Sequence, residues 1–194
     1  MPSNTGPFGD AFAPPYDDPY AVTSGSTTGS SESLADVQPP NDQAAEKAVL
    51  GAMLLSKDLP PLMHQIVRAE DFYTPAHGRI YDAIIKLSSN EEPADAVTVA
   101  DQLEKDGELE RIGGRPYLHT LIESVPSPAS GPYYAQIVAE KALLRRLIDV
   151  GMRITSYGYA ATEGMEVEEM VNRAQAEIYS VTEQRRTEDY KSLD

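Results

Sequence analysis

The chain has 194 residues, of which 41% are hydrophobic, and its 31 acidic and 16 basic residues give a formal net charge of −15. This length suits one compact domain with an appendage, and the charge disfavours direct nucleic-acid binding, because proteins that bind phosphates do so with lysine and arginine. The absence of cysteine excludes disulfides and thiolate chemistry, and without a signal peptide or an apolar run of bilayer length we expect a cytoplasmic protein with protein partners and no membrane contact.

The first 40 residues differ in composition from the rest of the chain. They are rich in proline, serine, glycine, threonine and tyrosine and contain no lysine or arginine. Such a segment buries too little apolar surface to offset the entropy of ordering, so residues 1–40 are predicted to be a disordered tail. Tyr16 and Tyr20 are its candidates for a short-motif contact.

Helical patterns begin directly after this tail. Asn41 and Asp42 are suited to cap a helix whose apolar residues recur at helical spacing, and a second short helix fits residues 60–67. A third helix is expected from Pro75, with Thr74 as its cap.

The remaining part of this segment is also helical in pattern. Thr98 and Asp101 resemble a capping box at the start of a fourth helix, which would stop at Gly107. No stretch alternates convincingly between apolar and polar residues, so the predicted fold class is all-α.

The segment ELERIGGRPYL, residues 108–118, raises the possibility of a phosphate-binding loop. A P-loop needs a strand before it and a Lys-Ser/Thr pair after it, and Gly113 and Gly114 have neither. Pro116 would also remove one N–H donor from the start of the next helix. We therefore interpret Gly107, Gly113 and Gly114 as turn residues and expect no bound cofactor.

Residues 132–184 have the pattern of a helical hairpin. In the first helix, from about Tyr133 to Tyr159, one apolar stripe has heptad-like spacing and a second stripe lies about 120° away, consisting of Ile137, Leu144, Ile148 and Gly151. The second helix has one stripe, so the first helix has a surplus that packs either on the preceding helices or on another copy of the chain. The candidate interface residues are Leu143, Leu147, Val150, Ile154, Tyr157, Met170, Ala174 and Ile178. Charged residues on the remaining face of the first helix are expected in solvent: Arg145, Arg146, Asp149 and Arg153.

Signals for catalysis or metal binding are weak. Glu166, Glu168 and Glu169 fall in the first turn of the second hairpin helix, where they suit the positive end of its dipole. An acid–base enzyme that uses these glutamates with His119 stays open as an alternative. No histidine and acid cluster has metal-ligand spacing, so we predict neither catalytic nor metal-binding residues.

Four collinear segments resemble the N-terminal domain of the DnaB-type replicative DNA helicases of bacteria. They read AEKAVLGAMLL, EDFYTPAHGRIYDAI, PADAVTVADQLEKDGELERIGGRPYLHTL and YYAQIVAEKALLRRLIDVGMRI, and the resemblance covers roughly residues 39–184. It implies a globular helical head, residues 41–131, followed by the hairpin, residues 132–184. The segment RRTEDYKSLD resembles the start of the linker to an ATPase motor, which places a linker at residues 185–194.

The resemblance also implies partners. In that family, hairpins pair between subunits, the domains form a trimer-of-dimers collar, and primase and loader proteins dock there. ATP and magnesium belong to the motor domain, so we expect this chain by itself not to hydrolyse ATP, although the parent helicase is an ATP-dependent enzyme. The helicase-binding domain of bacterial primases, which is similar in fold, is the alternative within this class.

Overall fold

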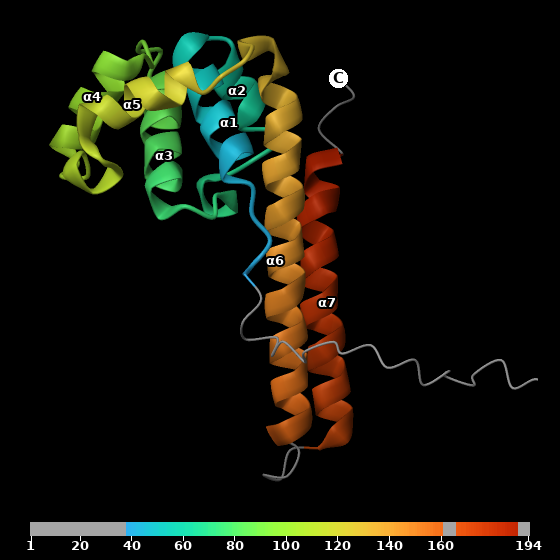
Figure 1. Cartoon of the computed structure of the whole chain (residues 1–194). Coiled ribbons are helices and arrows are strands. Elements are labelled where there is room, and N and C mark those ends of the chain that lie inside the picture. Colours follow the sequence, from blue (N-terminus) through green and yellow to red (C-terminus); the bar gives the residue numbers. More distant parts are fainter. Residues whose placement is uncertain (1–37, 161–165, 190–194) are drawn as a thin grey trace, which may run out of the picture. The chain divides into compact units, whose positions relative to one another are not determined.

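The computed structural model describes residues 38–160 and 166–189, and within these ranges every regular element is a helix (Figure 1). The predicted all-α fold, a multi-helix head followed by a long hairpin, is therefore confirmed. Among the described helices, none combines the length and continuous hydrophobicity of a membrane-spanning segment.

Helix α1 (Gln43–Leu55) is the central element of the head and packs against α3, α5 and α6. Its start is set by the predicted cap, because the Asp42 carboxylate accepts a hydrogen bond from the backbone N–H of Ala45 at 2.9 Å. Nearly all of its residues from Ala45 to Leu54 are buried. Since three helices cover it, α1 has no polar face to expose, unlike an ordinary surface helix.

The next three elements are α2 (Leu59–Met63), the 3-10 turn η2 (Ala69–Asp71) and α3 (Pro75–Ser89). Helix α2 ends at Met63 and thus before the predicted end at residue 67. Helix α3 begins at Pro75 as predicted, but the Thr74 hydroxyl makes no capping hydrogen bond. This hydroxyl is buried without a hydrogen-bond partner, and the backbone N–H groups of Tyr73 and Thr74, just before the helix, bond to a carboxylate of α1 described below.

Helix α4 (Ala96–Lys105) starts earlier than the capping-box pattern predicted. The cap is Asp95, whose carboxylate accepts hydrogen bonds from the backbone N–H groups of Val97 and Thr98 at 2.9 and 3.0 Å. The assignment of Thr98 as the cap was wrong, because Thr98 lies inside the first turn and its hydroxyl donates to the Pro93 carbonyl. Aspartate is the stronger N-cap of the two residue types.

The paired glycines connect the 3-10 turn η3 (Glu110–Ile112) to α5 (Gly114–Glu123). Gly113 and Gly114 have φ values of 100° and 74°, and Gly107 after α4 has 71°. These left-handed conformations favour glycine. The Gly113 and Gly114 N–H groups bond to the Glu110 and Leu109 carbonyls, so both donors are used inside the turn.

Helix α6 (Gly131–Ala160) follows the 3-10 turn η4 (Pro128–Ser130) and belongs to both parts of the molecule. Its first half packs on the head through Ala135, Val138 and Ala142, and its second half packs on α7 (Val167–Asp189), which returns beside it in Figure 1. Helix α7 continues past residue 184, where the hairpin was predicted to end. Residues 1–37 of the predicted tail and residues 190–194 of the predicted linker lie outside the described residues.

Candidate interaction surface

The two hairpin helices meet along a seam that is partly polar. On α6 the seam contains Val150, Arg153 and Tyr157, and on α7 it contains Glu177 and Val181. The Glu177 carboxylate accepts from the Arg153 guanidinium at 2.9 Å and from the Tyr157 hydroxyl at 2.9 Å. These two bonds lie near the buried side chains of Val150 and Val181, so they help to set which face of each helix turns inward.

A second face of the hairpin is apolar and exposed. On α6, Leu144, Leu147 and Ile148 are about half exposed, and together with Gly151 they fall within an arc of about 100°. On α7, the exposed apolar side chains are Val167, Val171 and Ile178. We call these seven residues the exposed stripe.

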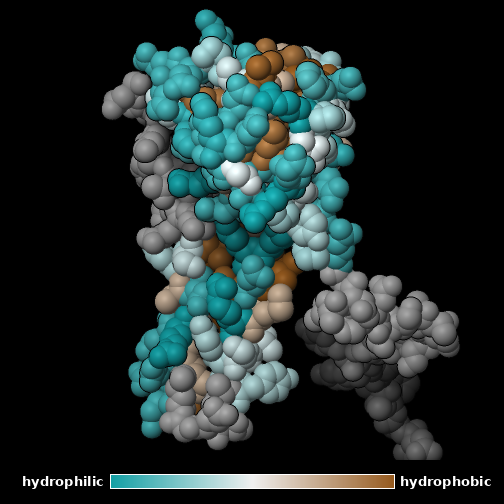
Figure 2. Space-filling model, turned by 90° about the vertical axis from the view of Figure 1, so that its left-hand side faces the viewer, coloured by the Kyte–Doolittle hydropathy of each residue, from teal (hydrophilic) through white to brown (hydrophobic). Residues whose placement is uncertain are grey.

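The two halves of the exposed stripe lie on the same side of the hairpin. Viewed along each helix from its N-terminus, the exposed residues are rotated about the helix axis away from the seam in the same direction. Because α6 and α7 are antiparallel, this places both sets of exposed residues on the same side of the hairpin. In Figure 2, hydrophobic atoms emerge between hydrophilic ones where the hairpin leaves the head. Exposed apolar side chains on one side of two packed helices are typical of a protein–protein contact.

The eight residues predicted for the subunit interface differ in their exposure within one chain. Val150 and Met170 are 2% and 8% exposed and are buried within one chain, and Tyr157 is bonded in the seam. Leu147 and Ile178, by contrast, are 54% and 52% exposed. The other three, Leu143, Ile154 and Ala174, are half-buried.

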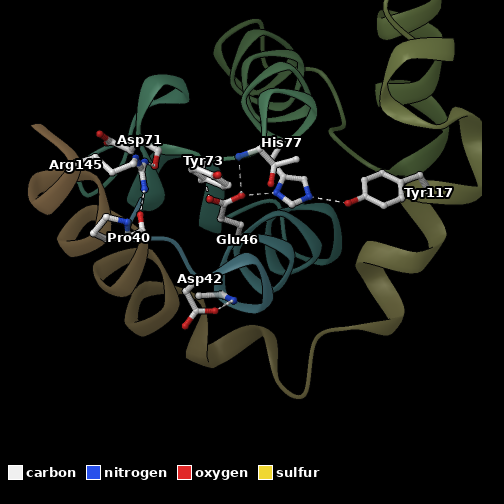
Figure 3. A network of polar contacts seen from close by, with 10 residues as sticks. Pro40, Asp42, Glu46, Asp71, Tyr73, His77, Tyr117 and Arg145 are labelled. Atoms are coloured by element: carbon white, nitrogen blue, oxygen red, sulfur yellow. Dashed lines mark hydrogen bonds and ion pairs between the residues drawn. The ribbon is translucent and has the colours of Figure 1, made fainter. Parts of the chain in front are cut away.

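A buried polar network crosses the head between α1, α3 and α5 (Figure 3). His77 Nδ1 donates to the Glu46 carboxylate at 2.6 Å, and His77 Nε2 lies 2.7 Å from the Tyr117 hydroxyl. Both Glu46 and His77 are 1% exposed. When the imidazole ring is neutral, Nε2 accepts a hydrogen bond from the Tyr117 hydroxyl. When the ring is protonated, Nε2 donates a hydrogen bond to the hydroxyl oxygen.

Glu46 also receives backbone donors from the loop before α3. The N–H groups of Tyr73 and Thr74 lie 2.6 and 3.3 Å from its two carboxylate oxygens. Burial alone would raise the pKa of Glu46, but the hydrogen bond from His77, the amide of Tyr73 and the charge of His77 outweigh burial and lower it. This carboxylate therefore fixes the loop that leads into α3.

We predict that Glu46→Gln lowers the free energy of unfolding by about 2 kcal/mol. The side-chain amide nitrogen of the glutamine would face one of the N–H groups that now donate to Glu46, and this buried N–H group would lose its acceptor. Urea denaturation measures this loss. Since the folded-state pKa of Glu46 is below its ordinary value of 4.5, the carboxylate stabilises fully above that pH and its contribution is lost as the pH falls through the folded pKa. The difference between parent and variant should thus shrink below about pH 4 to 5.

The control for this experiment is Glu140→Gln, because Glu140 is an exposed glutamate on α6. Its unfolding free energy should match the parent within about 0.5 kcal/mol. An equal loss in both variants, or a Glu46→Gln difference that grows on acidification, would contradict the role assigned to Glu46.

Two arginines join the head to α6, which corrects the prediction that they face solvent. The Arg145 guanidinium donates to the Pro40 carbonyl at 2.7 Å and to the Asp71 carbonyl, and it lies over the Tyr73 ring (Figure 3). Arg146 forms an ion pair with the Asp71 carboxylate. The helical pattern of the sequence identifies Arg145 and Arg146 as polar positions, but it cannot predict that the head packs beside them.

The candidate acid–base group is dispersed. Glu166, Glu168 and Glu169 are exposed at the start of α7, where Glu169 pairs with Arg173, and His119 is exposed on α5. No hydrogen bond or ion pair in the described part joins His119 to these glutamates. Among the described residues there is also no group of histidine and acidic side chains arranged to hold a metal ion.

Comparison with known proteins gives one consistent family. Residues 38–140 match the family model described as the DnaB-like helicase N-terminal domain. A curated relative, the replicative DNA helicase DnaB of Mycobacterium leprae, is 59% identical over 157 residues, which cover 81% of this chain. The chain spans only 26% of the length of that relative.

Solved structures agree with this family. The N-terminal domain of DnaB helicase from Mycobacterium tuberculosis is 59% identical, with a TM-score of 0.70, and the match covers 73% of this chain and 99% of that one. A DnaB-like replicative helicase, described together with its interactions with primase, is 23% identical with a TM-score of 0.58 over 79% of this chain and 36% of that one. At this identity the second match supports the fold alone. The matches name helicases and so do not favour the alternative of a primase domain.

Proposed function

The chain belongs to the family of DnaB-like helicase N-terminal domains, and we propose that it acts as the assembly and docking domain of a replicative helicase. In this role two copies pair through their hairpins, dimers assemble into the collar of a hexamer, and the collar receives primase and helicase loaders. ATP-driven unwinding of DNA is proposed for the whole protein, whose motor would bind ATP and magnesium.

The observation that carries this proposal is the exposed stripe. Leu144, Leu147 and Ile148 on α6 and Ile178 on α7 leave apolar surface in water within one described chain. Covering such surface contributes about 25 cal/mol per Å², and a self-complementary patch is covered by a second copy through a two-fold axis. The acidic chain, with its net charge of −15, fits a domain that contacts proteins more than DNA.

Primase is the proposed partner outside the helicase. Support comes from the DnaB-like helicase of similar fold, whose structure is described with its interactions with primase. An acid–base enzyme is the weaker candidate, because its carboxylates are exposed and separate from His119.

The test is sedimentation velocity on the chain alone and in mixture with the primase of the same organism. We expect a dimer that dissociates on dilution and a heavier complex after primase is added. A monomer at every concentration would contradict the pairing, and an unchanged boundary after addition of primase would contradict the docking.

A further inference from the structure

The apolar part of the contact between the head and α6 involves the first turns of the helix. Its buried α6 residues are Ala135, Val138 and Ala142, and Tyr134 and Ile137 pack against the same core while partly exposed. Beyond Ala142, α6 is held on the head by polar contacts.

The polar part of this contact is directional. Arg145 and Arg146 lie on the next turn of the same face, and beyond them Arg153 and Tyr157 of α6 bond to Glu177 of α7. The Arg145 guanidinium bridges two carbonyls from different segments, Pro40 before α1 and Asp71 in η2. A planar guanidinium that donates to two fixed acceptors tolerates little rotation.

The acceptor side of this contact is itself held rigidly. Asp71 is 4% exposed, and its second carboxylate oxygen accepts from the Arg68 N–H at 2.8 Å. Burial raises the pKa of Asp71, although the Arg68 amide and the charges of Arg146 and Arg145 oppose this. Arg146 supplies the opposite charge that this buried carboxylate needs, so the ion pair ties α6 to η2.

We propose that Arg145 and Arg146 form an orientation latch, which fixes the direction in which the hairpin leaves the head. Four elements meet at the latch: the segment before α1, η2, the Tyr73 loop and α6. If the hairpins pair as proposed above, the latch also sets where each head lies relative to the partner copy.

The latch can be tested by distance measurements between spin labels. The chain has no cysteine, so Glu123→Cys on α5 and Ser156→Cys on α6, both at exposed positions, label the head and the hairpin uniquely. Dilution with unlabelled chain restricts the signal to distances within one chain, which makes the result independent of dimer formation. Arg145→Gln/Arg146→Gln should widen the distance distribution at least about twofold, since the charge-assisted contacts beyond Ala142 are lost.

The matched control is Arg153→Gln, which removes an arginine ion pair within the hairpin and should leave the distribution unchanged. Asp71→Asn, which keeps the backbone acceptor but removes the charge, should also widen the distribution, and circular dichroism should show that this variant remains helical. An unchanged distribution in the double variant overturns the latch. Loss of helical circular dichroism in that variant also overturns it, because the arginines would then hold the fold and not its direction.

Discussion

Replacing Leu144 and Leu147 by aspartate is expected to convert the proposed dimer into a folded monomer. Each side chain is about half exposed in one chain, so covering it further contributes about 1 kcal/mol, and the two positions occur twice in a symmetric dimer. Burying the new carboxylates adds a desolvation cost. Together these changes should raise the dissociation constant about a thousandfold or more, measured by sedimentation equilibrium.

The matched control for this double variant is Met152→Asp/Ser156→Asp. Both residues are exposed on the same helix but lie outside the exposed stripe, and the added charge is identical. The control should remain dimeric, and both variants should keep the helical circular dichroism of the parent. A dimeric Leu144→Asp/Leu147→Asp protein would exclude the exposed stripe as the interface, and an unfolded one would assign these residues to the core.

The second large effect is expected at Gly51 in α1, for which alanine should destabilise the head severely. A Cβ atom built there would overlap the Leu121 carbonyl oxygen and the Val125 side chain, so α1 and α5 must separate. Overpacking of this kind costs about 1 to 3 kcal/mol and more where backbone is involved, which for a chain of this size lowers the melting temperature by about 5 °C or more.

Gly158→Ala is the control, because nothing lies within 4 Å of a Cβ atom at this exposed position of α6. It should leave the melting temperature unchanged or raise it slightly, since alanine favours a helix interior by up to about 1 kcal/mol. Similar melting temperatures for Gly51→Ala and the parent would show that the two helices can move apart at little cost.

Local signals predicted much of the fold. The Asp42 cap, the start of α3 at Pro75 and the glycine turn depend on residues close together in sequence, and the structure has them as expected. Exceptions are α2, which ends before its predicted end, the Thr74 hydroxyl, which makes no capping bond, and α4, where a Thr98 pattern competed with the better cap Asp95. Such competition is decided by backbone geometry, which propensities do not resolve.

The polar contacts could not be predicted, because they join distant positions. Glu46 and His77 are 31 residues apart, and nothing in the pattern of either helix marks them as a pair. The helical wheel of α6 predicted two apolar stripes, but it could not indicate which of them is buried against other helices of the same chain. That choice depends on Arg153 and Glu177, whose pairing across the hairpin is visible only when both helices are in place.

The continuity of α6 has a consequence for folding. Starting a helix is unfavourable and extending one is not, and short isolated helices are marginal in water. The turns of α6 around Ala135 and Val138 form inside the core, so the head supplies the nucleus from which the outer turns propagate. Head and hairpin are therefore one cooperative unit, and a truncated chain that ends at residue 131 would lose the α6 side chains that complete the core of the head.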